Sequence, residues 1–192
     1  GAPVDKTTMQ PFYFIKDAGS LVESGATLPY PPGTRDCQHE MELVVAIGAD
    51  GFRVAEADAP SLVWGYACGL DMTRRDLQRV AREAGKPWDL AKNFEGAAVL
   101  SGIVPKAGAD VLQSGAITLQ VNGLTRQSGN LAQLIWSIPE LIADLSRFYH
   151  LQPGDLIFTG TPEGVSAVVP GDRLTGRIEG VGEITLTIGE AE

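Results

Sequence analysis

The sequence has 192 residues, 44% hydrophobic and 20% charged, as is typical of one soluble globular domain and not of a disordered, collagenous or coiled-coil chain. Its net charge of −9 repels a phosphate backbone and argues against a nucleic-acid partner. No apolar run reaches the roughly 18 residues that a membrane span needs, and Cys37 and Cys68 lack the spacing of a disulfide framework or a zinc site. We therefore expect a cytoplasmic protein with reduced thiols and no membrane partner.

The first 35 residues predict an irregular arm. Proline and glycine recur through it, and its short apolar run at 12–15 predicts a single strand. The sequence begins with Gly1 instead of Met, so we expect the natural chain to have further residues upstream. Residues 36–192 are expected to form a single catalytic domain.

Two strands and a helix are predicted next along the chain. Apolar, β-branched runs at 40–48 and 63–70 are typical of buried strands. Thr73 and Asp76 have the spacing of a capping box, and apolar residues of helical period follow up to a stop at Gly85. A helix over 73–84 is therefore expected.

The remainder of the chain predicts more strands than helices. Asn122 and Gly123 are the best two-residue hairpin turn in the sequence, and a second helix is expected over 139–149, with proline in its first turn. Further strands are expected at 116–121, from Leu124, and at 155–159, 172–178 and 183–188. The sequence thus predicts an α+β fold, rich in β-structure, with a few peripheral helices.

Two glutamates, Glu40 and Glu42, open the first buried strand. Side chains at i and i+2 share one face of a strand, about 6–7 Å apart. Beside an apolar core such a pair needs protonation, basic partners or a cation, unless the strand lies at an edge and both side chains face water. Asp71, at the end of the second strand, either caps the following helix or completes a set of three oxygen donors. Three carboxylates without histidine or thiolate suit Mg²⁺ or Mn²⁺ better than zinc.

Cationic and polar side chains follow Asp71. Arg75 and Gln78 lie four and seven residues further on, so they either point back to this carboxylate or form a solvated helix face. A metal and a forked guanidinium together can bind an α-keto acid. Lys92 lies between apolar neighbours, where it either pairs with a carboxylate or extends to the surface. The segment 159–165 is either an anion-binding loop or a plain turn after a strand.

Four segments of the sequence, in order and spacing, resemble the fumarylacetoacetate hydrolase family. They are Glu40-x-Glu42, 69–78 (GLDMTRRDLQ), 85–94 (GKPWDLAKNF) and 159–165 (TGTPEGV). Within the family, residues 64–78 look most like the hydrolases of acylpyruvates. The resemblance implies a mixed β-roll, usually a homodimer, with Mg²⁺ or Mn²⁺ held by Glu40, Glu42 and Asp71.

The resemblance also implies an activity and a substrate site. The expected reaction is hydrolysis of a C–C bond in an acylpyruvate, with fumarylpyruvate giving fumarate and pyruvate in aromatic-acid breakdown. The residues expected at the pyruvoyl end of the substrate are Arg75, Gln78, Lys92 and Thr161, and Lys16 is expected to reach the same pocket. We expect a catalytic role for Lys92, because a cation offsets the charge of the departing enolate.

The resemblance further implies a water-activating histidine in an Asn-Tyr-x-x-His segment upstream of a Phe-x-x-Lys strand, which this sequence does not contain. His39 and His150 are expected to be structural, since strand alternation turns His39 away from Glu40. Two alternatives stay open. One is decarboxylation or isomerisation of an oxaloacetate-like or hydroxymuconate-type keto acid, which needs no such histidine. The other is an inactive interaction or scaffold domain that binds no divalent cation.

Overall fold

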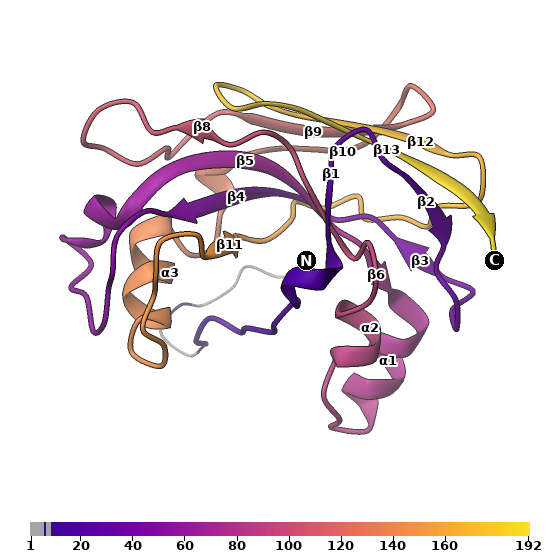
Figure 1. Ribbon diagram of the computed structural model, residues 1–192, viewed down its shortest axis with the longest axis horizontal. Coiled ribbons are helices and arrows are strands. Elements are labelled where there is room, and N and C mark those ends of the chain that lie inside the picture. The colour runs from indigo at the N-terminus through magenta and orange to yellow at the C-terminus, as the bar shows by residue number, and fades with distance from the viewer. Residues whose placement is uncertain (1–5, 7–8) are drawn as a thin grey trace.

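Two β-sheets lie in two layers and enclose the apolar core (Figure 1). The computed structural model describes Lys6 and residues 9–192. The first sheet has the order β1-β7-β5-β4-β11, with β8 also paired to β5. Its strands are β1 (Leu21–Glu23), β7 (Ala98–Leu100), β5 (Val63–Asp71), β4 (Met41–Ile47), β11 (Leu156–Phe158) and β8 (Val104–Pro105).

The second sheet has the order β10-β9-β12-β13-β2. Its strands are β10 (Leu124–Asn130), β9 (Ala116–Val121), β12 (Arg173–Ile178), β13 (Gly182–Ala191) and β2 (Thr27–Tyr30). A separate two-stranded ribbon pairs β3 (Cys37–Gln38) with β6 (Thr73–Arg74). Mixed sheets with few helices confirm the predicted fold class.

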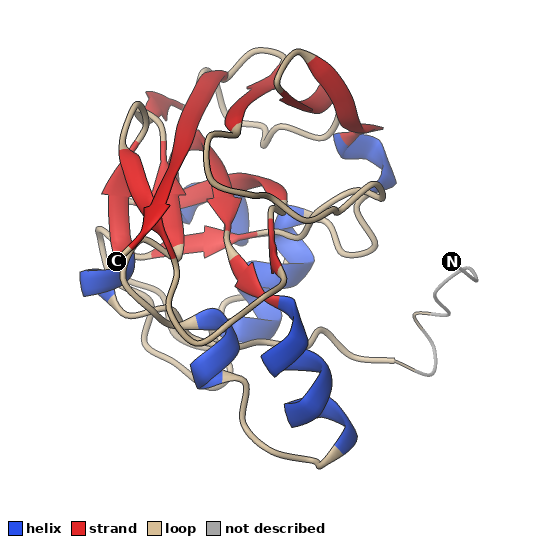
Figure 2. Cartoon of the chain, turned by 90° about the vertical axis from the view of Figure 1, so that its right-hand side faces the viewer, coloured by secondary structure: helices blue, strands red, loops and turns tan. Residues whose placement is uncertain are grey.

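The helices are short and lie outside the sheets (Figure 2). They are α1 (Arg75–Glu83), α2 (Asp89–Lys92) and α3 (Ile138–Leu145), with 3₁₀ turns at Ala18–Ser20, Ala59–Leu62 and Leu131–Gln133. Helices α1 and α2 pack side by side, whereas α3 packs against the turn at Ala59–Leu62. In the part of the chain that the structure describes, none of these helices has the length and apolar composition needed to cross a bilayer.

Strand β4 is buried along its whole length and divides its side chains between two faces. Met41, Leu43 and Val45 face the second sheet and join the apolar core. Each such buried side chain contributes about 1.5–3 kcal/mol of transfer free energy. Since side chains alternate along a strand, Glu42 points to the other face, away from the second sheet. Packing of the core therefore fixes the direction in which this carboxylate points.

Most of the predicted strands are confirmed. The runs at 40–48 and 63–70 form β4 and β5, and the three runs after residue 154 form β11, β12 and β13. The hairpin turn between β9 and β10 has positive φ at both central residues, 52° at Asn122 and 79° at Gly123. These are the angles that a tight two-residue turn requires.

The two predicted helices begin or end elsewhere. Helix α1 begins at Arg75 instead of residue 73, because Thr73 and Arg74 pair with β3. The expected capping box does not form, since the Asp76 carboxylate accepts hydrogen bonds from Thr34 Oγ1 at 2.5 Å and from the backbone N–H of Arg35 at 3.0 Å. Helix α3 ends at Leu145, well before residue 149, and Ser137 caps its start.

The arm differs most from expectation. Residues 12–15 form no strand; instead, Phe12 and Phe14 pack on Trp88, with ring centroids 4.8 and 6.1 Å apart. The arm supplies two other strands, β1 and β2, which run parallel to β7 of the first sheet and β13 of the second. The predicted strand at 12–15 is therefore wrong.

Candidate active site

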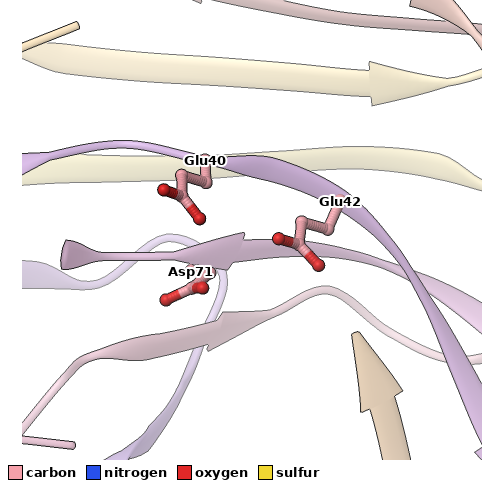
Figure 3. A group of neighbouring side chains, drawn as sticks. All are labelled: Glu40, Glu42 and Asp71. Atoms are coloured by element: carbon pink, nitrogen blue, oxygen red, sulfur yellow. The ribbon is translucent and has the colours of Figure 1, made fainter. Parts of the chain in front are cut away.

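Three carboxylates from two neighbouring strands converge at one point (Figure 3). Glu42 lies in β4 opposite Gly69 of β5, and the backbone N–H of Asp71 donates to the carbonyl of Glu40 at 2.9 Å. Glu40 therefore faces Asp71 across the strand pair, while Glu42 lies one pleat further along the same face. One ligand atom from each side chain lies within 4.8 Å of the others, and all three side chains are buried.

Three cationic side chains neutralise this cluster. The Lys92 ammonium donates to Glu40 at 2.8 Å, to Asp71 at 2.6 Å and to the Thr73 hydroxyl at 2.7 Å. Lys16 brings a second ammonium from the arm, with Nζ 2.8 Å from Asp71 Oδ1. Arg75, the first residue of α1, donates from its guanidinium to the second oxygen of Glu40. The cluster thus holds three carboxylates and three cationic side chains, and most of the six are buried.

Among the residues that the structure describes, Glu42 is the carboxylate of the triad without a cationic partner. Its Oε2 accepts a hydrogen bond from the backbone N–H of Gly160 at 2.8 Å. Burial, together with repulsion from Asp71 and Glu40, raises the pKa of Glu42 to about 8. Burial also raises the pKa of Asp71, in spite of its two lysine partners. For Glu40 burial acts in the same direction, but Lys92 and Arg75 outweigh it, so its pKa is lowered.

The cluster fits a hard divalent cation. Asp71 Oδ1 is buried and forms an ion pair with Lys16, whose Nζ lies 2.8 Å away without the geometry of a good hydrogen bond. Asp71 lies beside Glu42, a carboxyl group whose pKa is raised by burial and by like charges, so a divalent cation between the two side chains would stabilise both. All the ligands are carboxylate oxygens, which suit Mg²⁺ or Mn²⁺.

The structure places the other expected residues around this cluster. The Arg75 guanidinium donates to the side-chain oxygen of Gln78 as well as to Glu40. Arg75 faces Glu40 and not Asp71, the carboxylate its spacing suggested, because Asp71 ends a strand before α1 begins. Thr161 lies next to Gly160 and donates its hydroxyl to the carbonyl of Met41 at 2.8 Å. Contacts of these residues with a substrate stay a prediction.

Neither histidine of the chain reaches the carboxylates. His39 is fully buried, and its ring nitrogens lie 3.0 Å from Gln127 Oε1 and 2.9 Å from Ser166 Oγ. His150 stacks on Phe52, with ring centroids 3.9 Å apart. The structural interpretation of both agrees with these contacts.

Sequence reasoning missed one contributor to the cluster and left a second one open. Thr73 was expected to cap a helix, but its hydroxyl accepts from Lys92. Gly160 lies in the segment 159–165, for which an anion-binding loop was one of two interpretations, and its backbone N–H donates to the Glu42 carboxylate. The one sequence feature that could have indicated Thr73 is its position: it is a polar residue only two places after Asp71.

Comparison with known proteins assigns the family. A family model described as the C-terminal part of fumarylacetoacetate (FAA) hydrolase matches residues 1–189. This chain belongs to the fumarylacetoacetate hydrolase family. Within that family, a fumarylpyruvate hydrolase from a Ralstonia species is 61% identical to it over 192 residues, 100% of each chain. The resemblance expected from the four sequence segments is confirmed.

Two further members of the fumarylacetoacetate hydrolase family bear on the site. A crystal structure of fumarylpyruvate hydrolase from Pseudomonas aeruginosa, in complex with Mn²⁺ and pyruvate, superimposes with a TM-score of 0.92. It is 45% identical and covers 97% of this chain and 82% of that chain. A mitochondrial oxaloacetate tautomerase from Rattus norvegicus is 40% identical over 172 residues, 90% of this chain and 78% of that protein. Proteins similar to this chain are therefore named both as fumarylpyruvate hydrolases and as oxaloacetate tautomerases.

Proposed function

We propose that this protein is a divalent-metal-dependent hydrolase that cleaves the C–C bond of fumarylpyruvate to give fumarate and pyruvate. The cation is Mg²⁺ or Mn²⁺, and Glu40, Glu42 and Asp71 hold it. The observation that carries the proposal is the buried triad itself, in which Glu42 has no cationic partner among the described residues while three cations surround Glu40 and Asp71. The relatives named as fumarylpyruvate hydrolases, one of them holding Mn²⁺ and pyruvate, support the same assignment.

The reaction needs positive charge where a carbanion departs. Water adds its oxygen to the acyl carbon, the C–C bond breaks, and a proton passes to the methylene carbon of the departing pyruvate enolate. A cation held by Glu40, Glu42 and Asp71 would supply Lewis-acid chemistry at the pyruvoyl group. Arg75 offers a forked donor for that carboxylate. Lys92, with Nζ held by three acceptors, stays a fixed positive charge beside the enolate.

The four polar residues expected to contact the substrate come from several elements. Lys16 comes from the arm, Arg75 and Gln78 come from α1, and Thr161 follows β11. We propose that these four side chains bind the keto acid. The ring of Phe14 lies 4.8 Å from Lys92 Nζ and adds an apolar wall beside the ammonium. Such a wall excludes water and strengthens the charge interactions inside the site.

A second candidate function is keto–enol interconversion of an oxaloacetate-like acid. It is favoured by one observation: neither histidine of the chain contacts the carboxylate cluster, and tautomerisation needs no activated water. The same cation and the same lysines would stabilise the enolate. Relatives named as oxaloacetate tautomerases are 37–40% identical to this chain.

One assay separates the two. The purified protein with Mn²⁺ is given fumarylpyruvate, loss of the enol absorbance is followed, and fumarate and pyruvate are quantified. The proposal predicts one fumarate and one pyruvate for each substrate consumed. Loss of enol absorbance without C–C cleavage, together with turnover of enol-oxaloacetate, would favour the tautomerase. No turnover of either acid with Mg²⁺ or Mn²⁺ would leave the scaffold alternative.

We further propose a homodimer in the cytoplasm. Large apolar side chains around the arm and α2 remain exposed, namely Phe12, Ile15 and Leu90, and a second subunit would cover such groups. Both cysteines are unpaired thiols, which suits a reducing compartment. Light scattering coupled to gel filtration tests the dimer, and cell fractionation tests the location.

A further inference from the structure

We propose that Gln127 is a positioning residue for the active site, although it contacts none of the three carboxylates. It lies in β10 of the second sheet, and its side chain holds the segment 159–164 against the start of β4. This inference rests on the proposed function, because it assigns Gln127 a role in that same site. It follows from a hydrogen-bond network that joins the two sheets.

The Gln127 amide uses its full hydrogen-bonding capacity within the protein. Its side chain is completely buried. Its oxygen accepts from the backbone N–H of Met41 at 3.0 Å and lies 3.0 Å from His39 Nδ1. Its nitrogen donates to Thr161 Oγ1 and to the carbonyl of Pro162, both at 2.8 Å. An amide has two donors and two acceptor sites, so none is left over.

The network determines which atoms of the neighbouring side chains carry protons. Since Gln127 Oε1 can only accept, His39 Nδ1 carries the proton, and His39 Nε2 accepts from Ser166 Oγ at 2.9 Å. The Thr161 hydroxyl accepts from Gln127 and donates to Met41 O. Every member of this network therefore has a single arrangement.

This arrangement places the residues that line the active site. Met41 lies between Glu40 and Glu42, so a bond to its N–H holds the strand that carries both carboxylates. Thr161 follows Gly160, whose N–H donates to Glu42. The Gln127 amide thus sets the distance between the strand and the segment that orients Glu42. Groups that orient metal ligands typically change metal affinity or activity by 10- to 100-fold when they are removed.

The substitution Q127E tests this role because it divides the network in two. A carboxylate keeps both acceptor contacts, to Met41 and His39, but loses both donor contacts, to Thr161 and Pro162. We expect kcat/KM for fumarylpyruvate to fall about 10- to 100-fold and Mn²⁺ affinity to fall about tenfold. Protonation of the introduced carboxyl restores one donor, so the defect relative to wild type at the same pH should shrink as the pH falls.

The matched control is Q120E, the same change at an exposed position on the neighbouring strand β9. It should leave kcat, KM and Mn²⁺ affinity within about twofold of wild type, as surface changes usually do. Hydrogen exchange gives a readout independent of turnover. In Q127E the amides of 159–164 should exchange faster, while those of β9 and β12 keep wild-type rates. If Q127E does not fold, Q127M, an apolar replacement of similar volume, is carried through the same measurements.

Three results would overturn the proposal. They are wild-type kinetics and Mn²⁺ affinity in the folded Gln127 variant, an equal loss in Q120E, or a loss accompanied by faster exchange throughout both sheets. Inactive wild-type protein would instead contradict the proposed function. In that case Mn²⁺ affinity and exchange of 159–164 still decide the role of Gln127.

Discussion

Replacing Glu42 by glutamine separates metal binding from folding. The Glu42 carboxyl has a pKa of about 8 and no cationic partner, so at pH 7 without metal it is mostly protonated. Glutamine is a neutral group of the same shape, and its oxygen can still accept from the N–H of Gly160. We therefore expect the free energy of unfolding of metal-free E42Q to lie within about 1 kcal/mol of wild type below about pH 4, where the carboxyl is protonated in both the folded and the unfolded chain. At pH 7 only the unfolded wild-type chain loses that proton, so E42Q should be the more stable protein.

The metal-induced stabilisation should differ sharply between the two proteins. At a Mn²⁺ concentration of about 100 times Kd, binding stabilises wild type by about 2.7 kcal/mol. For a domain of this size that corresponds to a rise in Tm of about 5–10 °C. E42Q replaces one of three anionic ligands and should show a shift below about 2 °C at the same concentration. Differential scanning calorimetry with and without Mn²⁺ measures both.

The pH dependence of the metal-free proteins supplies a further check on Glu42. Its pKa is raised from 4.5 to about 8 in the folded state, so the folded protein keeps a proton that the unfolded chain loses. Metal-free wild type should therefore lose stability relative to E42Q as the pH rises from about 4.5 to about 8. The exposed change E183Q in β13 is the control. An equal Mn²⁺-induced rise in Tm in E42Q and wild type would show that Glu42 is not a ligand of the cation.

Three other perturbations give distinct outcomes. Mn²⁺ must displace the proton of Glu42, so its affinity should rise up to about tenfold per pH unit and level off above about pH 8. Isothermal titration calorimetry measures this affinity, and a value independent of pH would count against Glu42 as a ligand. K92M leaves two buried carboxylates without their shared ammonium and should destabilise the metal-free protein to urea by about 3–5 kcal/mol. G164A places a Cβ only 2.0 Å from Arg126 O, at a backbone φ of 97°. G154A has a similar φ of 99° but nothing within 4 Å of the added Cβ, so G164A should lose more stability. The backbone strain that both variants share accounts for about 1–3 kcal/mol.

The strands could be predicted because local patterns determine them. Continuous apolar runs gave β4 and β5, and the turn at Asn122 and Gly123 gave the β9–β10 hairpin. The apolar run at 12–15 led to a wrong strand prediction, because apolar residues also pack as an extended segment on a neighbouring side chain, here Trp88. Strands β1 and β2 were missed because parallel pairing with β7 and β13 depends on contacts far away in sequence.

The candidate site was predictable as a set of residues but not as an arrangement. Spacing put Glu40 and Glu42 on one face of a strand, and their nearness to Asp71 depends on the β4–β5 register, which no local pattern fixes. The family resemblance supplied Lys16, which is remote in sequence. No sequence pattern indicated a buried position for Gln127. It turns inward from an otherwise exposed stretch of β10 because the pairing register shifts between residues 125 and 127.

The central claim is that Glu40, Glu42 and Asp71 together bind one divalent cation. Anomalous scattering from crystals grown with Mn²⁺ tests it most directly. We expect one strong anomalous peak per chain, at about 2.0–2.3 Å from an oxygen of each of the three carboxylates. A peak elsewhere, or no peak between these side chains at saturating Mn²⁺, would contradict it.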